Sequence, residues 1–308
     1  MTKPIFDLEN LPDIAKREIK AAAEIMAEPP QDIDFMHAVL CQVSMPRRAQ
    51  KEPVFRRASG DCGITLEAGS LWLNGRFTQQ QLPYGSRPRS IMAHISTEAV
   101  RTRRKEIYVG DSLHAFMKGL NINTGGREYA RFKHQLYRLA ACRMTLGFSS
   151  YEPDGMRRDI TGNAQPIQKF EAWLTPDPNQ RVMWPGVLEL SQEFFETLLE
   201  HAVPLDRRAL SALKHSALCL DIYCWLAHRR NRITKHDCVK LSWQNLHFQF
   251  GQEYGNRKDF KREFKNALHQ VLAVYPTAKI ESTYGGIILK PSTPPIPKPR
   301  IVVNHGDD

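Results

Sequence analysis

Apolar residues recur at steps of three and four across residues 125–143, and basic residues occupy the opposite side of the same pattern. The apolar positions are Tyr129, Phe132, Leu136, Leu139 and Ala140. The basic positions are Arg127, Arg131, His134 and Arg138, with Gln135 and Cys142 at their edge. This period predicts an amphipathic helix with one side in a core. Because Glu128 alone offsets these cations, we expect the polar side to bind an anion; a solvated basic face is the alternative.

The flanking segments place this helix in a larger unit. A short helical pattern over residues 111–120, with Asp111 or Ser112 as its N-cap, is followed by the turn NINTGG. This order predicts a helix-turn-helix. Two extended runs, MTLGFSSYE and IQKFEAWL, are joined by DGMRRDITGN and predict a β-wing with Arg157 and Arg158 at its tip. A helix sized for the major groove beside an arginine-tipped ribbon favours binding of duplex DNA.

The same order of elements recurs in the second half of the chain. Strand, helix, helix, strand and short helix are expected over residues 187–190, 192–201, 214–230, 238–241 and after Ser242. A basic helix capped by Asn256 follows, and AKIESTYGGIILK predicts a second wing. The inward positions of this helix are Phe260, Phe264, Ala267, Leu268 and Val271, and the outward ones are Lys258, Arg262, Lys265, Asn266 and His269. Phe132, Leu136 and Leu139 align with Phe264, Leu268 and Val271 at one constant offset, which indicates an internal duplication.

We therefore expect an α+β fold of two tandem winged-helix domains, at residues 57–175 and 180–290. The boundary is the proline-rich stretch TPDPN. Residues 1–56 are expected to form a flexible extension that contains one helix, and the basic run over residues 45–57 is either a linker or an arm that lies on phosphates. A hairpin is expected over residues 63–77. Residues 291–308 hold five prolines and are expected to be a disordered tail.

Composition supports a polyanion partner. The 308 residues carry 43 Lys and Arg against 33 Asp and Glu, a formal net charge of +10, and residues 86–150 hold 12 of these basic residues but only 4 acidic ones. No run of 18 apolar residues and no signal-peptide core occur, so we expect a cytoplasmic protein. The six cysteines have no framework spacing and are expected to be reduced.

Enzymatic chemistry finds little support in the sequence. No Walker A loop, GxGxxG fingerprint or His-hydrophobe-His metal motif is present, so Tyr84 and Tyr129 lack the partners that a nucleophile would need. His236, Cys238, Cys219 and Cys224 could be drawn as zinc ligands, but the absence of a CxxC pair favours packing. We expect a protein that is not an enzyme and that has no cofactor and no metal.

Several blocks of sequence closely resemble the plasmid-encoded RepA replication initiator family. They are PYGSRPR (residues 83–89), STEAVRT (96–102), VGDSLHAFM (109–117), TGGR (124–127), LSQEFFETLLEHAVPLD (190–206) and LCLDIYCWLAHR (218–229). The resemblance covers most of residues 53–275. It implies an iteron-type initiator that binds repeated duplex sites at a plasmid origin, helps to open the adjacent A·T-rich DNA, and recruits the host helicase and host initiator proteins. It also implies a homodimer in equilibrium with monomer.

Two other classes stay open at this stage. A winged-helix transcriptional repressor would have the same fold and charge without initiator activity, and a nicking initiator would need a metal and a nucleophile. Within the DNA-binding interpretation, the arginine-rich first helix is expected to read bases and the lysine-rich second helix to contact phosphates, with Arg262 as an exception that could read a base.

Overall fold

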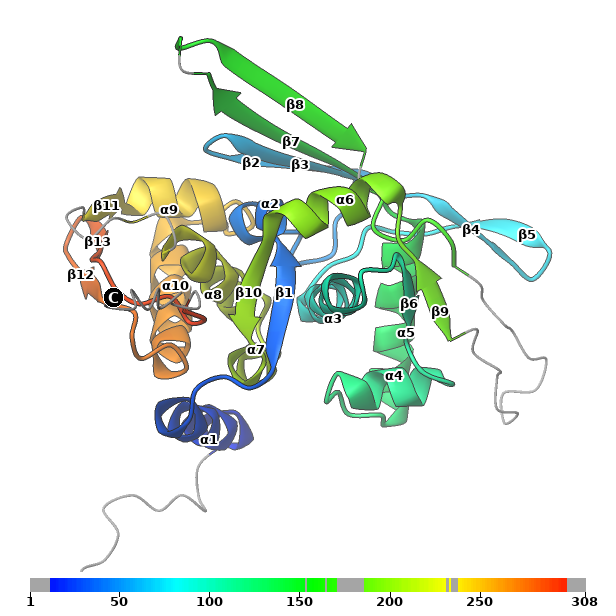
Figure 1. Cartoon of the computed structure of the whole chain (residues 1–308), viewed down its shortest axis with the longest axis horizontal. Helices are drawn as coiled ribbons and strands as arrows, with labels where there is room; N and C mark the ends of the chain where they lie inside the picture. The colour runs from blue at the N-terminus through cyan, green and yellow to red at the C-terminus, as the bar shows by residue number, and fades with distance from the viewer. Residues whose placement is uncertain are drawn as a thin grey trace, which may run out of the picture.

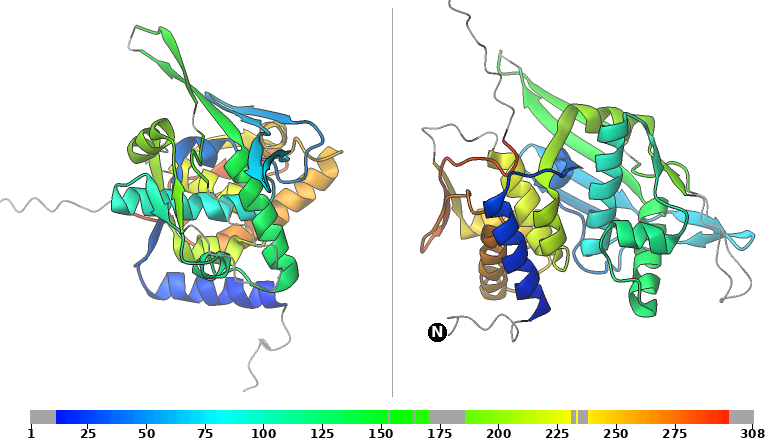
Figure 2. Two further views of the ribbon diagram at one scale, coloured as in Figure 1. Left: turned by 90° about the vertical axis from the view of Figure 1, so that its right-hand side faces the viewer. Right: turned by 60° about the horizontal axis from the view of Figure 1, so that its bottom comes forward.

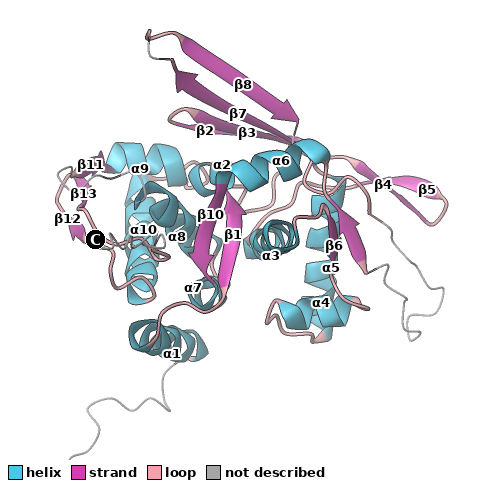
Figure 3. Ribbon diagram, viewed as in Figure 1, coloured by secondary structure: helices cyan, strands magenta, loops and turns pink. Residues whose placement is uncertain are grey.

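The computed structural model of the chain describes residues 12–152, 154–163, 165–170, 186–230, 233 and 238–297. Figure 1 shows two α/β halves on either side of a central ribbon made of β1 (Ile33–His37) and β10 (Ala202–Asp206). Helices and several small sheets alternate throughout both halves (Figure 3). The expected mixture of helices and strands is therefore confirmed.

The first half combines a curved sheet with three helices. Its sheet has the antiparallel order β2-β3-β7-β8. The strands are β2 (Val54–Ser59), β3 (Cys62–Glu67), β4 (Ser70–Leu73), β5 (Arg76–Gln79), β6 (Glu106–Tyr108), β7 (Arg143–Tyr151) and β8 (Arg157–Asn163). The helices are α3 (Ser86–Thr102), α4 (Leu113–Gly119) and α5 (Gly126–Ala141). Leu66, Ile91 and Phe132 are among the side chains that fill its core.

The second half has more helix and a smaller sheet, with the antiparallel order β11-β13-β12. Its strands other than β10 are β11 (Val239–Ser242), β12 (Ile280–Ser282) and β13 (Gly286–Leu289). β9 (Val187–Glu189) comes later in the chain than the first half but lies with it, because it pairs with β6. The helices of the second half are α7 (Arg207–Leu213), α8 (Ala217–Arg230), α9 (Trp243–Phe250) and α10 (Arg257–Ala273). α6 (Gln192–His201) crosses the top of the ribbon and contacts β1, α3 and β8 (Figure 1). Trp225, Tyr223 and Phe264 lie in its core.

The order helix, strand, helix, helix, strand, strand occurs once in each half. It runs through α3, β6, α4, α5, β7 and β8, and again through α8, β11, α9, α10, β12 and β13. The aligned apolar residues are buried in both copies, since Phe132 and Phe264 are each 0% exposed. The sheets differ, because β11 pairs with β13 whereas β6 pairs with β9. The winged-helix duplication thus stays a prediction.

Side chains cap most of the helix starts that the sequence marks. Ser112, Ser191 and Ser242 each accept a hydrogen bond from a backbone amide three residues later, at 3.1–3.2 Å. Asn256 caps α10 by accepting from the amide of Asp259 at 2.8 Å. Each cap satisfies an amide that the helix itself leaves unpaired. The predicted helix over residues 214–230 is shorter than expected and begins at Ala217, after a turn that separates it from α7.

The predicted extension at the N-terminus is integrated into the fold over its described residues. It contains α1 (Asp13–Ala27), β1 and α2 (Ala38–Gln42). β1 pairs antiparallel with β10, with Ile33 opposite Asp206, so the expectation of a flexible extension is wrong for this part of the chain. Of the predicted tail, residues 291–297 are described, and there the carbonyl of Thr293 accepts a hydrogen bond from the Tyr275 hydroxyl at 3.2 Å. The expected boundary at residues 175–179 lies outside the described residues.

Two predicted hairpins have different boundaries in the structure. The run SLWLNGRF does not pair with GITLEA; it folds on itself as β4 and β5, because Asn74 and Gly75 adopt positive φ values of 52° and 72° that suit a tight two-residue turn. The hairpin expected as the first wing is formed by β7 and β8, so the segment RRDITGN is a strand rather than the expected loop. Residues 167–170 of the predicted partner strand lie elsewhere, with Lys169 bridged to Glu189, and residues 171–174 lie outside the described residues.

A buried ionic network joins the two halves. The guanidinium of Arg89, on α3, donates two hydrogen bonds to the Asp221 carboxylate on α8, at 2.6 and 2.9 Å. Arg57, on β2, donates to Glu253 at 2.8 Å, and Arg47 lies 3.6 Å from Asp221. The Arg89 and Asp221 residues are only 5% and 6% exposed. The expectation that residues 45–57 form a linker or a phosphate-binding arm is wrong for these arginines, because carboxylates of the chain itself neutralise them.

Removal of one partner in this network should destabilise the fold strongly. Asp221→Ala leaves the Arg89 guanidinium buried without its carboxylate, and breaking a buried pair in this way costs about 3–5 kcal/mol. We expect a corresponding fall in the free energy of unfolding measured by urea titration. Glu281→Ala is the control, because it removes the exposed pair with Lys290 and should leave the urea midpoint unchanged. A loss below about 1 kcal/mol for Asp221→Ala would contradict a role for this pair in joining the halves.

Candidate nucleic-acid interface

Helix α5 presents two chemically different sides, as its sequence predicts. Phe132, Leu136 and Leu139 are each 0% exposed, and Phe132 packs edge-on against Phe116 of α4 with ring centroids 5.5 Å apart. This packing fixes α5 against α4 across the turn at residues 120–125. The helix begins after Gly125, whose amide donates to the Asn123 side chain at 2.8 Å. The polar side of α5 is thereby directed away from the core.

The basic residues of α5 are accessible to different degrees. Arg127, Arg131 and His134 are exposed, and Arg127 and His134 make no ion pair within the described part of the chain. Arg131 lies 3.0 Å from Glu128. Glu128 also accepts from Arg87 at 2.6 Å, and this hydrogen bond, assisted by Arg131, lowers the pKa of the Glu128 carboxyl. Glu128 therefore stays ionised and orients Arg131 along the outer face of the helix.

Arg138 and Gln135 depart from the expected outward position. Gln135 is 7% exposed, and its side-chain oxygen accepts a hydrogen bond from the backbone amide of Tyr84 at 2.9 Å. Its predicted contact with DNA is therefore wrong, because the amide group is used to hold the segment before α3. Arg138 is half-buried: it donates to Gln81 at 2.7 Å and lies over the Tyr84 ring, 5.2 Å from the centroid. Its guanidinium is held in one orientation at the end of the basic face.

Helix α10 carries the second predicted face. Phe260, Phe264 and Val271 are buried at 1% exposure or less. All five outward residues predicted from the sequence are exposed: Lys258, Arg262, Lys265, Asn266 and His269. Arg262 lies 3.2 Å from both Asp259 and Glu263, so its charge is partly neutralised within the helix. The lysines have no such partner among the described residues.

A cluster beside α10 was missed by sequence reasoning. The ammonium of Lys261 lies over the rings of Trp243 and Tyr284, 4.8 and 5.6 Å from their centroids, and that of Lys265 lies 5.6 Å from the Trp243 ring. Tyr284, between β12 and β13, is 96% exposed. The available signal was an aromatic residue beside the glycine turn of the second wing. The cluster extends the basic face of α10 towards that wing.

The hairpin of β7 and β8, predicted as the first wing, carries Arg157 and Arg158 at the start of β8. Both are more than half exposed, but each has an acidic neighbour: Arg157 lies 2.8 Å from Asp159, and Arg158 lies 4.0 Å from Glu152. Arg157 also donates to Ser149 at 2.9 Å. The hydrogen bonds from Ser149 and Arg157 lower the pKa of Asp159. These contacts are solvent-accessible, so a phosphate could displace them at little cost.

The two basic helices lie on opposite sides of the central ribbon (Figure 1). In the left view of Figure 2, α5 and α10 both lie towards the right-hand edge. The helices are thus separated by the body of the protein. This arrangement provides two basic faces on one chain.

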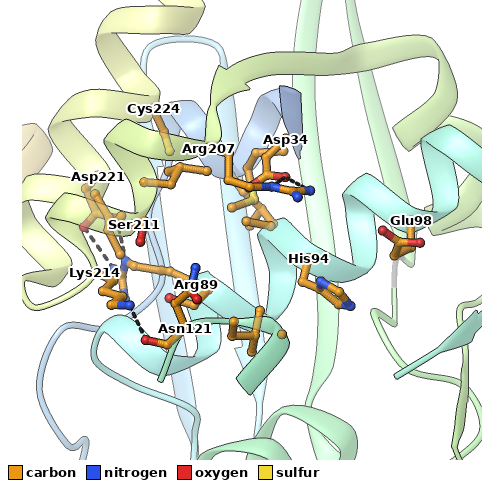
Figure 4. A pocket seen from close by; sticks show the side chains of 18 of the residues that line it. Asp34, Arg89, His94, Glu98, Asn121, Arg207, Ser211, Lys214, Asp221 and Cys224 are labelled. Carbon is orange, nitrogen blue, oxygen red and sulfur yellow. Dashed lines mark hydrogen bonds and ion pairs between the residues drawn. The ribbon is translucent and has the colours of Figure 1, made fainter. Parts of the chain in front are cut away.

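A cavity of about 170 Å³ lies between α3, α7 and α8 (Figure 4). Four of its charged side chains form two ion pairs with one another. Arg89 binds Asp221, and Arg207 lies 2.8 Å from Asp34. Burial lowers the pKa of His94, a further lining residue. The cavity belongs to the contact between the two halves, and a third cation, Lys214, donates to the backbone carbonyl of Asn121.

The remaining residues that could bind a metal or act in catalysis do not lie together in one site within the described part of the chain. Among the described residues, no group of three or more His, Cys, Asp or Glu side chains is placed to hold a metal ion. Cys219 and Cys224 are buried, Cys238 is exposed, and His236 lies outside the described residues. Tyr129 packs against the His114 ring with centroids 4.8 Å apart. Within the described part of the chain, no helix is both long and apolar enough to span a membrane.

Comparisons with known proteins identify the family of the chain. A comparison with curated proteins gives no match. Among solved structures, a selenomethionine derivative of domains 2 and 3 of RctB has a TM-score of 0.49 at 10% identity, covering 82% of this chain and 97% of that one. A second structure of RctB domains 2–3 has a TM-score of 0.47 at 11% identity, covering 82% and 94%. The family model described as plasmid encoded RepA protein matches residues 82–245, more than half of the 308 residues. The chain belongs to the plasmid-encoded RepA family of replication initiators.

Proposed function

We propose that the protein initiates plasmid replication by binding repeated duplex sites at the origin through two winged-helix units, with α5 and α10 in successive major grooves. The observation that carries the proposal is the pair of basic helix faces, one in each half of a RepA-family chain. A helix of this size fits the major groove, and two such helices on one chain would read half-sites about one helical turn apart. No covalent chemistry, cofactor or metal is needed for this role.

The two faces differ in the contacts that they favour. The first face offers Arg127, Arg131 and Arg138, and an arginine can donate two hydrogen bonds to guanine O6 and N7. The second face is richer in lysine, with Lys258, Lys261 and Lys265, which favours phosphate contacts. Arg157 and Arg158 on the first wing would contact the backbone beside the groove. Base readout is thus assigned mainly to the first half and general affinity to the second.

Opening of the adjacent A·T-rich duplex and recruitment of the host helicase and initiator proteins complete the proposed function, with a homodimer as the storage form. Footprinting on the DNA that flanks the gene tests site binding. A plasmid that carries the origin but lacks the gene should replicate only when the protein is supplied in trans.

A winged-helix repressor is the second candidate, because two basic faces serve repression equally well. Repression of the gene's own promoter without plasmid replication would favour it.

A nicking mechanism can be distinguished from the proposed one by experiment. We expect supercoiled origin DNA incubated with the protein and magnesium to stay supercoiled, because the proposed role requires binding alone. The appearance of relaxed circles on an agarose gel would contradict the non-enzymatic role and would indicate a nucleophile.

Arg131→Ala should reduce sequence preference as well as affinity. Loss of a bidentate base contact costs about 1–3 kcal/mol for the origin repeat and much less for unrelated DNA. Gel-shift titrations with the repeat and with a scrambled duplex of equal length measure both. Lys20→Ala is the charge-matched control, since Lys20 is 79% exposed on α1, outside both faces. Equal losses on the two duplexes would contradict base readout by Arg131.

Replacement of Lys261 and Lys265 by alanine should weaken binding uniformly. Each phosphate contact that is lost reduces the slope of log affinity against log salt by about 1, so the double variant should lose about 2 from the slope on both duplexes. Fluorescence anisotropy across a salt series measures this slope, again beside Lys20→Ala. An unchanged slope would show that the cluster at Trp243 does not contact phosphates.

A further inference from the structure

The hairpin of β4 and β5 carries an exposed aromatic pair. Trp72 lies opposite Phe77 in the strand register, and the two rings meet edge-to-face with centroids 4.9 Å apart. Trp72 is 62% exposed and Phe77 is 75% exposed. The other side of the hairpin, with Leu71 and Leu73, is half-buried. One side of the ribbon therefore faces solvent with two large rings, an arrangement that folding alone does not favour.

The hairpin starts at the end of the basic helix α5. Gly69 lies so close to the Ala141 carbonyl that a Cβ atom at this position would stand 2.2 Å from its oxygen, so the close approach of the two segments requires glycine. On the return side, Gln81 and Tyr84 hold Arg138, the last cation of the α5 face. Figure 1 shows β4 and β5 extending from this end of α5 away from the rest of the fold. The hairpin thus adjoins the end of the proposed DNA-binding face.

The charge around the rings favours a polyanion. The sequence holds no Asp or Glu between Glu67 and Glu98, and the hairpin itself carries Arg76. Ser70 and Gln79 flank the rings on the same side and are hydrogen-bonded to each other at 2.8 Å. The ring side of the hairpin thus combines two rings with uncharged polar groups, while Arg76, opposite Leu73, adds a positive charge on the other side near the turn. Aromatic rings in surroundings free of acidic residues are typical of a platform for nucleic-acid bases.

The size of the patch argues against a stable protein partner. Two aromatic side chains offer roughly 300–500 Å² of surface together even if completely exposed, whereas a specific protein interface buries about 800 Å² on each side. An intact duplex is also a poor occupant, because its bases present edges in the grooves and keep their faces stacked. The faces of unpaired bases match the two rings in size and chemistry.

We propose that Trp72 and Phe77 stack on unpaired bases of DNA, so that the β4–β5 hairpin holds one strand where the duplex has opened. This inference rests on the proposed initiator function and deepens it, because it gives the protein a single-strand site adjoining the duplex-reading face of α5. The rings would act by stacking, without base-specific hydrogen bonds, so the site would accept A·T-rich strands of varied sequence.

The test compares single-stranded and duplex DNA. The probes are a fluorescein-labelled 20-nucleotide oligo(dT) and a labelled duplex carrying the origin repeat, titrated with the full chain by anisotropy. Trp72→Ala/Phe77→Ala should weaken oligo(dT) binding by at least about tenfold, in line with the loss of base stacking. Binding of the duplex should stay within about twofold. Permanganate reacts with unpaired thymines. On a supercoiled origin plasmid, we expect this reactivity with the unmodified chain and its loss with the double variant.

Two control variants accompany the Trp72→Ala/Phe77→Ala variant. Tyr108→Ala removes another exposed aromatic ring, 60% accessible on β6, and should leave oligo(dT) binding unchanged. The exchange Trp72→Phe/Phe77→Trp keeps two rings and should retain binding. Because both rings are exposed, the thermal midpoint of Trp72→Ala/Phe77→Ala should equal that of the unmodified chain.

Several results would overturn the inference. Unchanged oligo(dT) affinity in the double variant would show that the two rings do not bind unpaired bases. Equal losses on oligo(dT) and duplex would assign the rings to duplex contact, and a change in sedimentation coefficient alone would assign them to self-association. If the unmodified chain bound oligo(dT) through the rings but not the repeat duplex, the proposed duplex-binding function would fail instead of this inference.

Discussion

The contact between Arg89 and Asp221 fixes how the two halves meet. It ties α3 to α8, while Arg57 and Glu253 tie β2 to the loop before α10. Burial alone would raise the pKa of Glu253, but the amide of Arg47 and the guanidinium of Arg57 lower it, so the carboxylate stays ionised. Buried charges demand defined partners and defined geometry. These ionic contacts therefore help to set the relative position of α5 and α10, together with an apolar core that is continuous across both halves. The proposed two-site binding of one duplex depends on that position.

The local spacing of apolar residues and capping residues was enough to predict the helices that form the candidate interface. The burial of Phe132 and Phe264 follows from their period, and Ser112, Ser191 and Asn256 cap the helices that they precede. These features depend on residues within one or two turns of each other, so the sequence contains the whole of the information. The exposure of the five outward residues of α10 could be predicted for the same reason.

Features that depend on distant partners could not be predicted in the same way. The period of α5 places Gln135 at the edge of its basic face, but the amide of Tyr84 that buries it comes from another segment. Arg47 and Arg57 belong to a basic run of the sequence but are neutralised in the fold by Asp221 and Glu253, which lie far along the chain. The turn at Asn74 and Gly75 was available as a short-range hairpin signal and outweighs the apparent pairing of longer alternating runs.

The pairing of β1 with β10 has a consequence for synthesis. Arg207 and Asp34, which bind each other at the end of this ribbon, are 173 residues apart in the chain. A ribosome adds about 5–20 residues per second, so the first strand waits roughly 10–30 seconds for its partner. During that interval β1 has an unpaired edge and the apolar side chains of Met36 and Leu40 lack their final cover. An unpaired strand edge and exposed apolar side chains favour misassociation, and binding of a chaperone to residues 33–45 would cover them until β10 is made.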